Sequence, residues 1–272
     1  MNLFKPKQYG QIEAWEAGFG PLGPPLMTVH VFLVGGVLID TGQSRMRSAI
    51  IGALAEKPID LILLTHHHED HSGNAGCLKR DHDVPVLGHP VTVEKMKQRY
   101  PILPYQQYTW GKADPVRVDP LPDMVEAGQL RLRPVHAPGH SRDHTVFLEE
   151  NQGWLFAGDL YLGDRIKYFR ADESMTDQIS SLEKVLKLDF EWLLCAHNPR
   201  PGQGKVHLRR KLDYLLNLRG EITALIQKGY SEKAIINRLK DRETRLIRLL
   251  CMGNVSFANM IRATVREYSV QT

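Results

Sequence analysis

The stretch Leu61–Asn74, LILLTHHHEDHSGN, constrains the fold and the chemistry of this chain most strongly. Apolar β-forming residues run into a cluster of imidazoles and carboxylates, a pattern typical of a buried strand that ends in a metal-binding loop. The order His66-x-His68-x-Asp70-His71 offers three imidazoles and one carboxylate, with no thiolate. These donors suit a borderline-soft divalent ion such as zinc. A solvated polar loop is the alternative, but it gives no reason for so many histidines.

The spacing within this stretch predicts how the donors are divided. His66 and His68 lie two residues apart at the end of an extended segment, so their side chains point the same way. Asp70 and His71 come where the chain turns into a helix, so these adjacent residues can face different ions. We expect the intervening residues to face away, and His67 is therefore not predicted to be a ligand.

Composition limits the class of protein. With 272 residues, 42% of them hydrophobic, the chain can bury a full core in one or two domains. Cys77, Cys195 and Cys251 are too few and too scattered for a disulfide scaffold, which favours a reducing compartment. The N-terminus has no apolar signal core, and no apolar run approaches the length of about 18 residues needed to span a membrane. We expect a cytoplasmic protein with no membrane partner.

The segment Thr65–His71, with the Ser-Gly-Asn that follows it, resembles the H-x-H-x-D-H signature of the metallo-β-lactamase superfamily. Two later segments extend the resemblance: Pro138-Gly139-His140 is similar to the superfamily's H-x-P-G-H segment, and Gly158-Asp159 follows a predicted strand where the superfamily places a bridging carboxylate. The implied fold is α/β, a four-layer αββα sandwich of two mixed β-sheets with a helical C-terminal extension. Asp40 matches an aspartate that supports the metal loop without binding metal.

The resemblance also implies a ligand set for two divalent metal ions. One ion would be held by His66, His68 and His140, the other by Asp70, His71 and His197, and Asp159 would bridge them. Zinc is the first choice, and iron or manganese would accept the same nitrogen and oxygen donors. A water shared by two such ions is acidified to a pKa of roughly 7 and serves as the nucleophile. Asp70 would orient that water and take its proton.

The chain departs from the superfamily pattern at two ligand loops. The common pattern after His140 continues with Pro-Gly-His, whereas this chain has Arg142-Asp143-His144 and therefore an extra ion pair in place of a flexible glycine. The last ligand normally lies between two glycines, but His197 lies between Ala196 and Asn198. We expect a more restricted loop there, with the ligand kept.

A long segment rich in proline and aromatics, residues 100–123, shows little periodicity and is predicted to be a loop. Long loops in compact domains are usually functional, so this one is a candidate wall or lid of the substrate pocket. Equally, its aromatic side chains could only pin the loop to the body of the protein. The candidate pocket residues are Tyr105, Tyr108, Trp110 and Tyr161.

The C-terminal part differs in composition and suggests two domains, a catalytic one at 1–204 and a helical subdomain at 205–272. Residues 205–272 carry 14 Lys and Arg against 6 Asp and Glu, and the preceding part carries 21 against 25, which gives net charges of +8 and −4. A basic tail indicates an anionic substrate, a nucleic acid or only solvated helix faces. Four helices are predicted in it, at 205–229, 231–240, 245–252 and 256–268.

Three functions compete. The leading hypothesis is a binuclear metal-dependent hydrolase that uses a metal-bridging hydroxide on a small thioester, lactone or other activated acyl substrate, as in the glyoxalase II branch that the chain resembles. The second is a phosphodiesterase or endoribonuclease acting on RNA or nucleotides, supported by the basic tail. The third is a metal-loaded, non-enzymatic ligand-binding protein. A small-molecule substrate is therefore the expected partner, ahead of nucleic acid, and a homodimer stays open.

Overall fold

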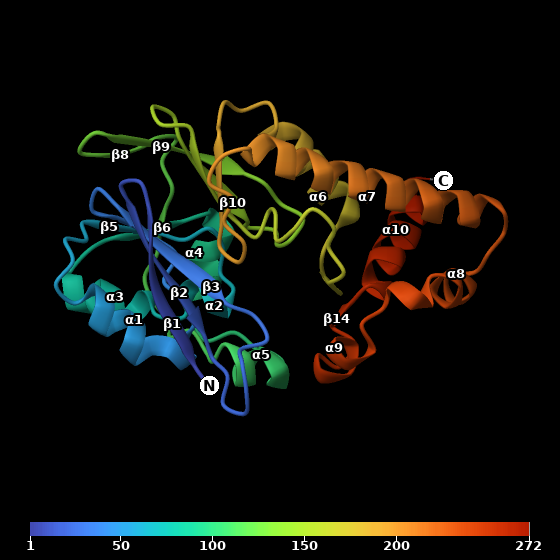
Figure 1. Cartoon of the computed structure of the whole chain (residues 1–272), viewed down its shortest axis with the longest axis horizontal. Coiled ribbons are helices and arrows are strands. Elements are labelled where there is room, and N and C mark those ends of the chain that lie inside the picture. The colour runs from blue at the N-terminus through green and yellow to red at the C-terminus, as the bar shows by residue number, and fades with distance from the viewer. Residues whose placement is uncertain (272) are drawn as a thin grey trace.

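The computed structural model describes residues 1–271 and contains two mixed β-sheets packed face to face (Figure 1). The first sheet has seven strands in the order β1-β2-β3-β4-β5-β6-β7. Its first four strands pair antiparallel and the rest pair parallel. The strands are β1 (Leu3–Tyr9), β2 (Ile12–Gly18), β3 (Val29–Val34), β4 (Val37–Ile39), β5 (Leu61–Leu63), β6 (Val86–Gly88) and β7 (Asp119–Pro120).

The second sheet has five strands in the order β13-β11-β10-β9-β8. Only β11 and β13 pair in parallel, so this sheet is mixed as well. A separate two-stranded sheet joins β12 to β14. These strands are β8 (Val125–Ala127), β9 (Leu130–His136), β10 (Thr145–Glu149), β11 (Trp154–Gly158), β12 (Phe169–Arg170), β13 (Trp192–Cys195) and β14 (Val255–Ser256).

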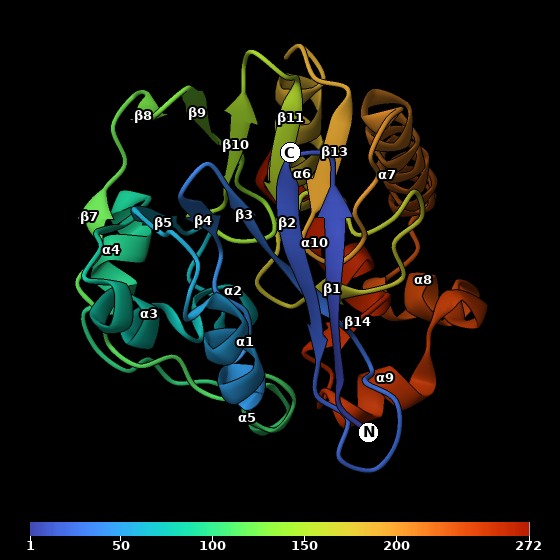
Figure 2. The same ribbon diagram turned by 60° about the vertical axis from the view of Figure 1, so that its left-hand side comes forward.

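Helices cover the outer faces of both sheets, which confirms the four-layer αββα arrangement (Figures 1 and 2). The helices of the first half are α1 (Arg47–Leu54), α2 (Glu69–Ser72), α3 (Ala75–His82), α4 (Pro90–Met96) and α5 (Pro104–Thr109). Those of the second half are α6 (Met175–Val185), α7 (Gly204–Gln227), α8 (Glu232–Arg238), α9 (Arg245–Leu250) and α10 (Ala258–Gln271). Within residues 1–271, no helix combines the length and apolar character needed to cross a membrane.

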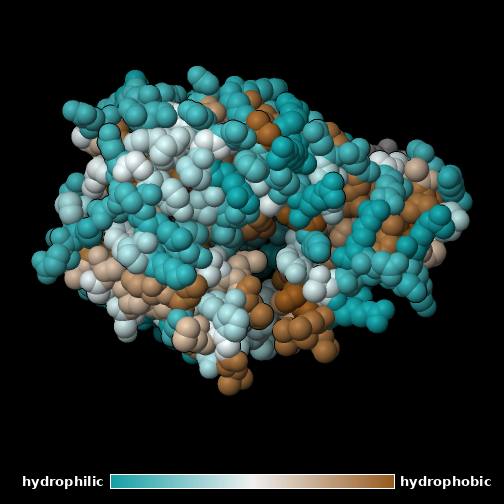
Figure 3. Space-filling model, in the orientation of Figure 1, coloured by the Kyte–Doolittle hydropathy of each residue, from teal (hydrophilic) through white to brown (hydrophobic). Residues whose placement is uncertain are grey.

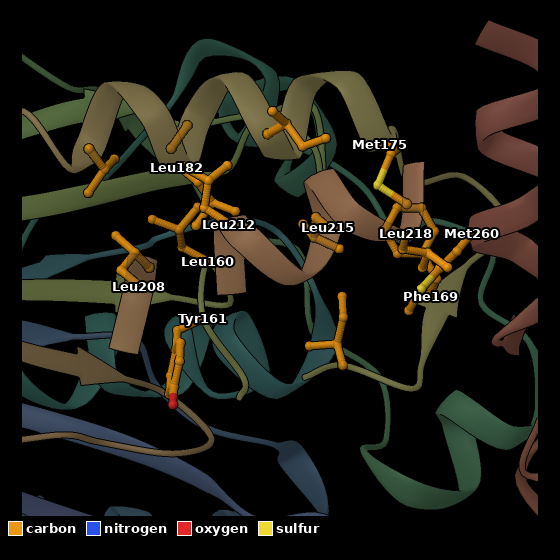
Figure 4. Packing of buried hydrophobic residues seen from close by; sticks show 14 of the residues in the cluster. Leu160, Tyr161, Phe169, Met175, Leu182, Leu208, Leu212, Leu215, Leu218 and Met260 are labelled. Carbon is orange, nitrogen blue, oxygen red and sulfur yellow. The ribbon is translucent and has the colours of Figure 1, made fainter. Parts of the chain in front are cut away.

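Three hydrophobic clusters correspond to the three interfaces between layers. One lies between the sheets and includes Phe32, Phe147 and Phe156. A second packs the first sheet against its helices, and a third packs the second sheet against α6, α7 and α10. Figure 4 shows part of the third cluster, where leucines of α7 lie beneath Leu182 of α6. Burial of apolar surface in these layers is the main force that holds the sandwich together.

The C-terminal helices share this third cluster with the sandwich. Leu212 and Leu215 of α7, together with Met260 of α10, are buried in the same cluster as Leu155 and Leu193 of the second sheet. The tail also completes the two-stranded sheet, because β14 pairs with β12. Residues 205–271 are therefore packed onto the rest of the chain as a continuous structure.

The structure differs from the sequence prediction at two places. The N-terminal residues form a β1–β2 hairpin that was not predicted, and the long segment at 100–123 is not a plain loop, because it contains α5. That helix has Pro104 in its first turn, where a missing N–H costs nothing, and the Gln106 side chain accepts a hydrogen bond from the Leu103 N–H at 2.9 Å. Periodicity cannot reveal a helix this short.

Candidate metal centre

Four segments of the chain bring the candidate ligands together at one edge of the sandwich. His66 follows β5, His140 follows β9, Asp159 follows β11 and His197 follows β13, while His71 lies on the short helix α2. These strand ends meet where the two sheets face each other. The ligands come from distant parts of the sequence, but they lie within one buried cluster.

The first group of donors contains only imidazoles. The Nε2 atom of His66 lies 2.9 Å from Nδ1 of His68, which lies 3.0 Å from Nε2 of His140. Three nitrogen atoms that converge in this way can hold one ion. This group is the one that the sequence assigned to the first metal.

The second group contains Asp70, His71 and His197. The Oδ2 atom of Asp70 lies 3.3 Å from Nε2 of His197 and 3.7 Å from Nε2 of His71. A carboxylate oxygen and two imidazole nitrogens therefore converge on a second point, and this group is the one assigned to the second metal.

Asp159 lies between the two groups, with one oxygen facing each. Its Oδ2 is 3.3 Å from Nε2 of His140 in the first group, and its Oδ1 is 3.3 Å from Nε2 of both His71 and His197 in the second. A carboxylate in this position can bridge two ions.

Hydrogen bonds on the far side of each ring fix the direction in which the imidazoles present their nitrogens. His71 Nδ1 donates to Asp40 at 2.7 Å, His140 Nδ1 donates to Glu173 at 3.0 Å, and His197 Nδ1 donates to the backbone carbonyl of Thr28 at 2.6 Å. Each bond leaves the Nε2 atom directed at the site, as in known metal centres. Asp40 contacts His71 and the Thr65 N–H but belongs to neither donor group.

The donor atoms fit divalent ions. Nε2 of His71 and Oδ1 of Asp159 are buried 3.3 Å apart, and neither makes a hydrogen bond of good geometry within the described residues, so a cation would satisfy both. Burial, with neighbouring imidazoles, holds the pKa of His66 and that of His68 well below the usual value, so both rings are neutral and have free lone pairs. Nitrogen and oxygen donors without thiolate match zinc, iron or manganese.

The two carboxylates of the site are ionised. Burial alone would raise the pKa of Asp159, but the adjacent His197, His71 and His140 hold it well below its usual range. The same balance between burial and the neighbouring imidazoles lowers the pKa of Asp70. Conversely, Asp70 and Asp159 outweigh the effect of burial and raise the pKa of both His71 and His197. The two carboxylates therefore supply negative charge that can attract cations.

His67 faces away from both groups, as the alternation of the strand end predicted. Its Nδ1 donates to Asp143 at 2.9 Å, and its backbone N–H donates to the same carboxylate at 2.8 Å. Asp143, the acid of the charged pair expected in this loop, thus hydrogen-bonds to His67, while the Arg142 side chain is exposed. His144 supports Asp159, because its Nε2 accepts the Asp159 N–H at 3.0 Å.

A cavity of about 180 Å³ opens above the donor atoms. Tyr105 and Trp110 line it, as do Asp70 and Asp159. Figure 3 shows a hollow in the surface, with apolar residues gathered over α9 beside it.

Two candidate pocket residues do not line this cavity. Tyr108 is 52% exposed and packs edge-on against Phe19, because it lies on the outer side of α5. Tyr161 is buried in the cluster beneath α7, where its hydroxyl contacts Asp164 and His207. Tyr108 and Tyr161 therefore lie outside this cavity, and their role in substrate binding stays a prediction.

Sequence reasoning missed three side chains near the centre. Glu173 positions His140, Asp143 holds the backbone of the metal loop, and Arg170 lines the cavity. Only Asp143 left a signal, as a departure from the expected pattern. Glu173 and Arg170 lie in a segment with no motif, so only the folded chain shows what they contact.

The fold and the site together define a class: an αββα sandwich with a buried centre of histidines and aspartates that can hold metal. A family model described as the metallo-beta-lactamase superfamily matches residues 25–197, and the chain belongs to this superfamily. It is therefore one of the superfamily's hydrolases. The superfamily uses metal ions, and the His and Asp groups described above can hold them.

Individual relatives are distant. A "Beta-lactamase-like protein 2 homolog" of Drosophila melanogaster is 28% identical over 75% of this chain and 68% of its own length. A "Hydroxyacylglutathione hydrolase" of Bdellovibrio bacteriovorus is 30% identical over 59% of this chain, and an "Atrochrysone carboxyl ACP thioesterase" of Aspergillus fumigatus is 31% identical over 80%. The chain matches only 57% and 46%, respectively, of the length of these last two.

A solved structure matches the whole fold. A metallo-beta-lactamase family protein from Thermus thermophilus superposes with a TM-score of 0.64 and covers 94% of both chains at 21% identity. This likeness confirms the fold and does not identify a substrate.

Proposed function

We propose that this hydrolase acts on a small activated acyl compound, a thioester or a lactone, with two divalent ions, most simply zinc. The observation that carries the proposal is Asp159, whose two oxygens each lie 3.3 Å from nitrogens of a different donor group. A site for one ion would need only one of these two carboxylate oxygens. Two relatives support the acyl substrate by their names, one a thioesterase and one a hydroxyacylglutathione hydrolase.

The residues that would hold the ions are the two groups described above, with Asp159 between them. When bound, such ions supply Lewis acidity and a water that is acidic enough to react near neutral pH. Asp70 lines the cavity and is 6% exposed, so its carboxylate can orient a water and accept its proton. Trp110 and Tyr105 narrow the cavity above the ligands and limit access of bulk water.

The tail gives less support to a nucleic-acid substrate. Arg210 pairs with Asp164 and Arg242 pairs with Glu221, while Lys211 is buried against the carbonyl of Leu160. Several of the basic residues that suggested an RNA-binding face are thus neutralised or inside the protein. We therefore propose a small-molecule substrate in place of RNA.

The test is turnover by protein reconstituted with zinc, iron or manganese. We expect hydrolysis of chromogenic thioesters or lactones and at least about 100-fold slower cleavage of bis(p-nitrophenyl) phosphate. Preferred cleavage of the phosphodiester would favour the nuclease alternative. No turnover of any substrate, with a small molecule retained through purification, would favour a binding protein and contradict the proposal.

A further inference from the structure

Arg170 is the one arginine or lysine among the described residues that line the cavity above the metal ligands. It lies at the end of β12, and its side chain is only 20% exposed. The rest of the wall beside it is largely apolar and includes Leu162, Phe169, Ile247 and Val255. A cation in such surroundings loses hydration, so its hydrogen-bond partners matter.

Most of the donors of Arg170 have no partner in the protein. Its Nε donates to Asp172 at 3.2 Å, and Asp172 is itself 61% exposed. Among residues 1–271, no atom accepts a hydrogen bond from either terminal nitrogen of this guanidinium. The nearby buried Glu69 forms no ion pair with it and accepts instead from Gln106 at 3.2 and 3.4 Å. Four of the five N–H groups of an arginine are therefore left for a ligand.

The fold holds Arg170 in place. It pairs in register with Val255 of β14, and the next residue, Ala171, donates its N–H to the carbonyl of Asn254 at 2.9 Å. The same turn of the tail contacts the cavity wall, because the Tyr105 hydroxyl donates to Asn254 at 2.6 Å. The C-terminal tail thus fixes the position of this guanidinium beside the metal ligands.

We propose that Arg170 binds a carboxylate of the substrate, so that the substrate has an apolar body and one carboxylate near the bond that is cleaved. The free terminal nitrogens form a planar fork that matches a carboxylate in a bidentate pair. The apolar wall takes the rest of the molecule, and the metal ligands face the scissile carbonyl. This inference rests on the proposed function, since it names the substrate class of the same site.

The first test measures binding without catalysis. Adipate, a dicarboxylate, is titrated into zinc-reconstituted protein by calorimetry, with hexanoate as the probe that lacks the second carboxylate. We expect Arg170→Gln to weaken adipate binding by at least about tenfold and Arg170→Lys to weaken it less, because charge-assisted hydrogen bonds are lost in part or in full. Lys167→Gln is the matched control, since Lys167 is exposed and does not line this cavity. Equal adipate affinity in wild type and Arg170→Gln would overturn the inference.

The second test compares turnover of two thioesters of N-acetylcysteamine, adipoyl and hexanoyl, which share their chain length and leaving group. We expect the wild type to favour the adipoyl compound by at least about tenfold in kcat/KM, and Arg170→Gln to reduce that ratio to about 1. A hexanoyl thioester of 3-mercaptopropionate places the carboxylate on the thiol half, and preference for it would support the same role for Arg170. Equal rates for all three substrates in both proteins would contradict it.

The two tests separate this inference from the proposed function. If neither the thioesters nor the chromogenic lactones are hydrolysed, the acyl hydrolase proposal fails, and the adipate titration still decides whether Arg170 is a carboxylate site. If all thioesters are hydrolysed without regard to the carboxylate, the hydrolase proposal stands and the role of Arg170 fails. Melting temperatures of the three variants show that each is folded.

Discussion

His66 and His67 are neighbours in the chain with opposite surroundings. His66 is fully buried among the other imidazoles, whereas His67 donates to Asp143 on the other side of the loop. Alternation along the strand end predicted this difference, which a count of histidines would have missed. Whether a histidine of this loop can bind metal depends on the direction in which its side chain points.

The first prediction concerns these two residues. His66→Ala should lose bound metal, while His67→Ala should retain the wild-type metal content and lose about 1–3 kcal/mol of stability, because Asp143 stays buried with fewer hydrogen bonds. Elemental analysis and urea unfolding measure the two effects. Loss of metal in His67→Ala to the same degree as in His66→Ala would show that the loop is wrongly assigned.

Glu173 gives a second prediction at this scale. Its Oε1 accepts from His140 Nδ1, and its Oε2 accepts from Gln178 at 2.6 Å. Glu173→Gln should lower affinity for the first ion by about 10–100-fold, the usual effect of removing a carboxylate behind a metal-bound histidine. Competition with a chelator measures the affinity for the metal ion. The control is Glu183→Gln, on the exposed side of α6. Unchanged affinity would mean that Glu173 serves only to pack the helix.

Among the strands and helices, the sequence predicted those that a local pattern of residues determines. The strand predicted before the histidine cluster is β5, and the four helices predicted in the tail correspond to α7, α8, α9 and α10. What it could not predict depends on contacts between distant segments. Arg170 and Glu173 belong to no recognisable motif. The position of Tyr161 under α7 depends on how the C-terminal helices pack onto the sandwich, which the sequence does not show.

The helix α7 carries a buried lysine that yields a third prediction. Lys211 donates to the Leu160 carbonyl at 2.7 Å, and burial lowers its pKa to about 8. The unfolded chain has a lysine pKa of about 10.4, so between these values it binds more protons than the folded chain and stability rises with pH. Thermal melts from pH 7.5 to 10.5 should show this rise for wild type relative to Lys211→Met. If the melting temperature changed with pH in the same way in both proteins, Lys211 would not titrate in this pH range.

At the scale of the whole molecule, the sandwich and the tail share one hydrophobic cluster. Figure 4 shows Leu215 and Leu218 of α7 and Met260 of α10 in the same layer as Leu182. The division at residue 204 therefore marks a change in composition and secondary structure, and we expect the two parts to unfold together.

Leu215→Ala tests that expectation as the fourth prediction. Leu215 is fully buried, so the change should cost about 2–5 kcal/mol and lower the midpoint of a single cooperative transition. Leu249→Ala, at a position that is 75% exposed, should change stability by less than about 0.5 kcal/mol. Two separate transitions in Leu215→Ala, with only one of them shifted, would show that the tail folds independently.

Distant segments of the chain bring together two groups of donor atoms, each of which can hold an ion. The most direct measurement is anomalous diffraction from crystals of the protein supplied with zinc. We predict two strong peaks, one among His66, His68 and His140 and one among Asp70, His71 and His197, with Asp159 between them. A single peak, or zinc bound only elsewhere on the surface, would show that these residues do not form a centre for two ions.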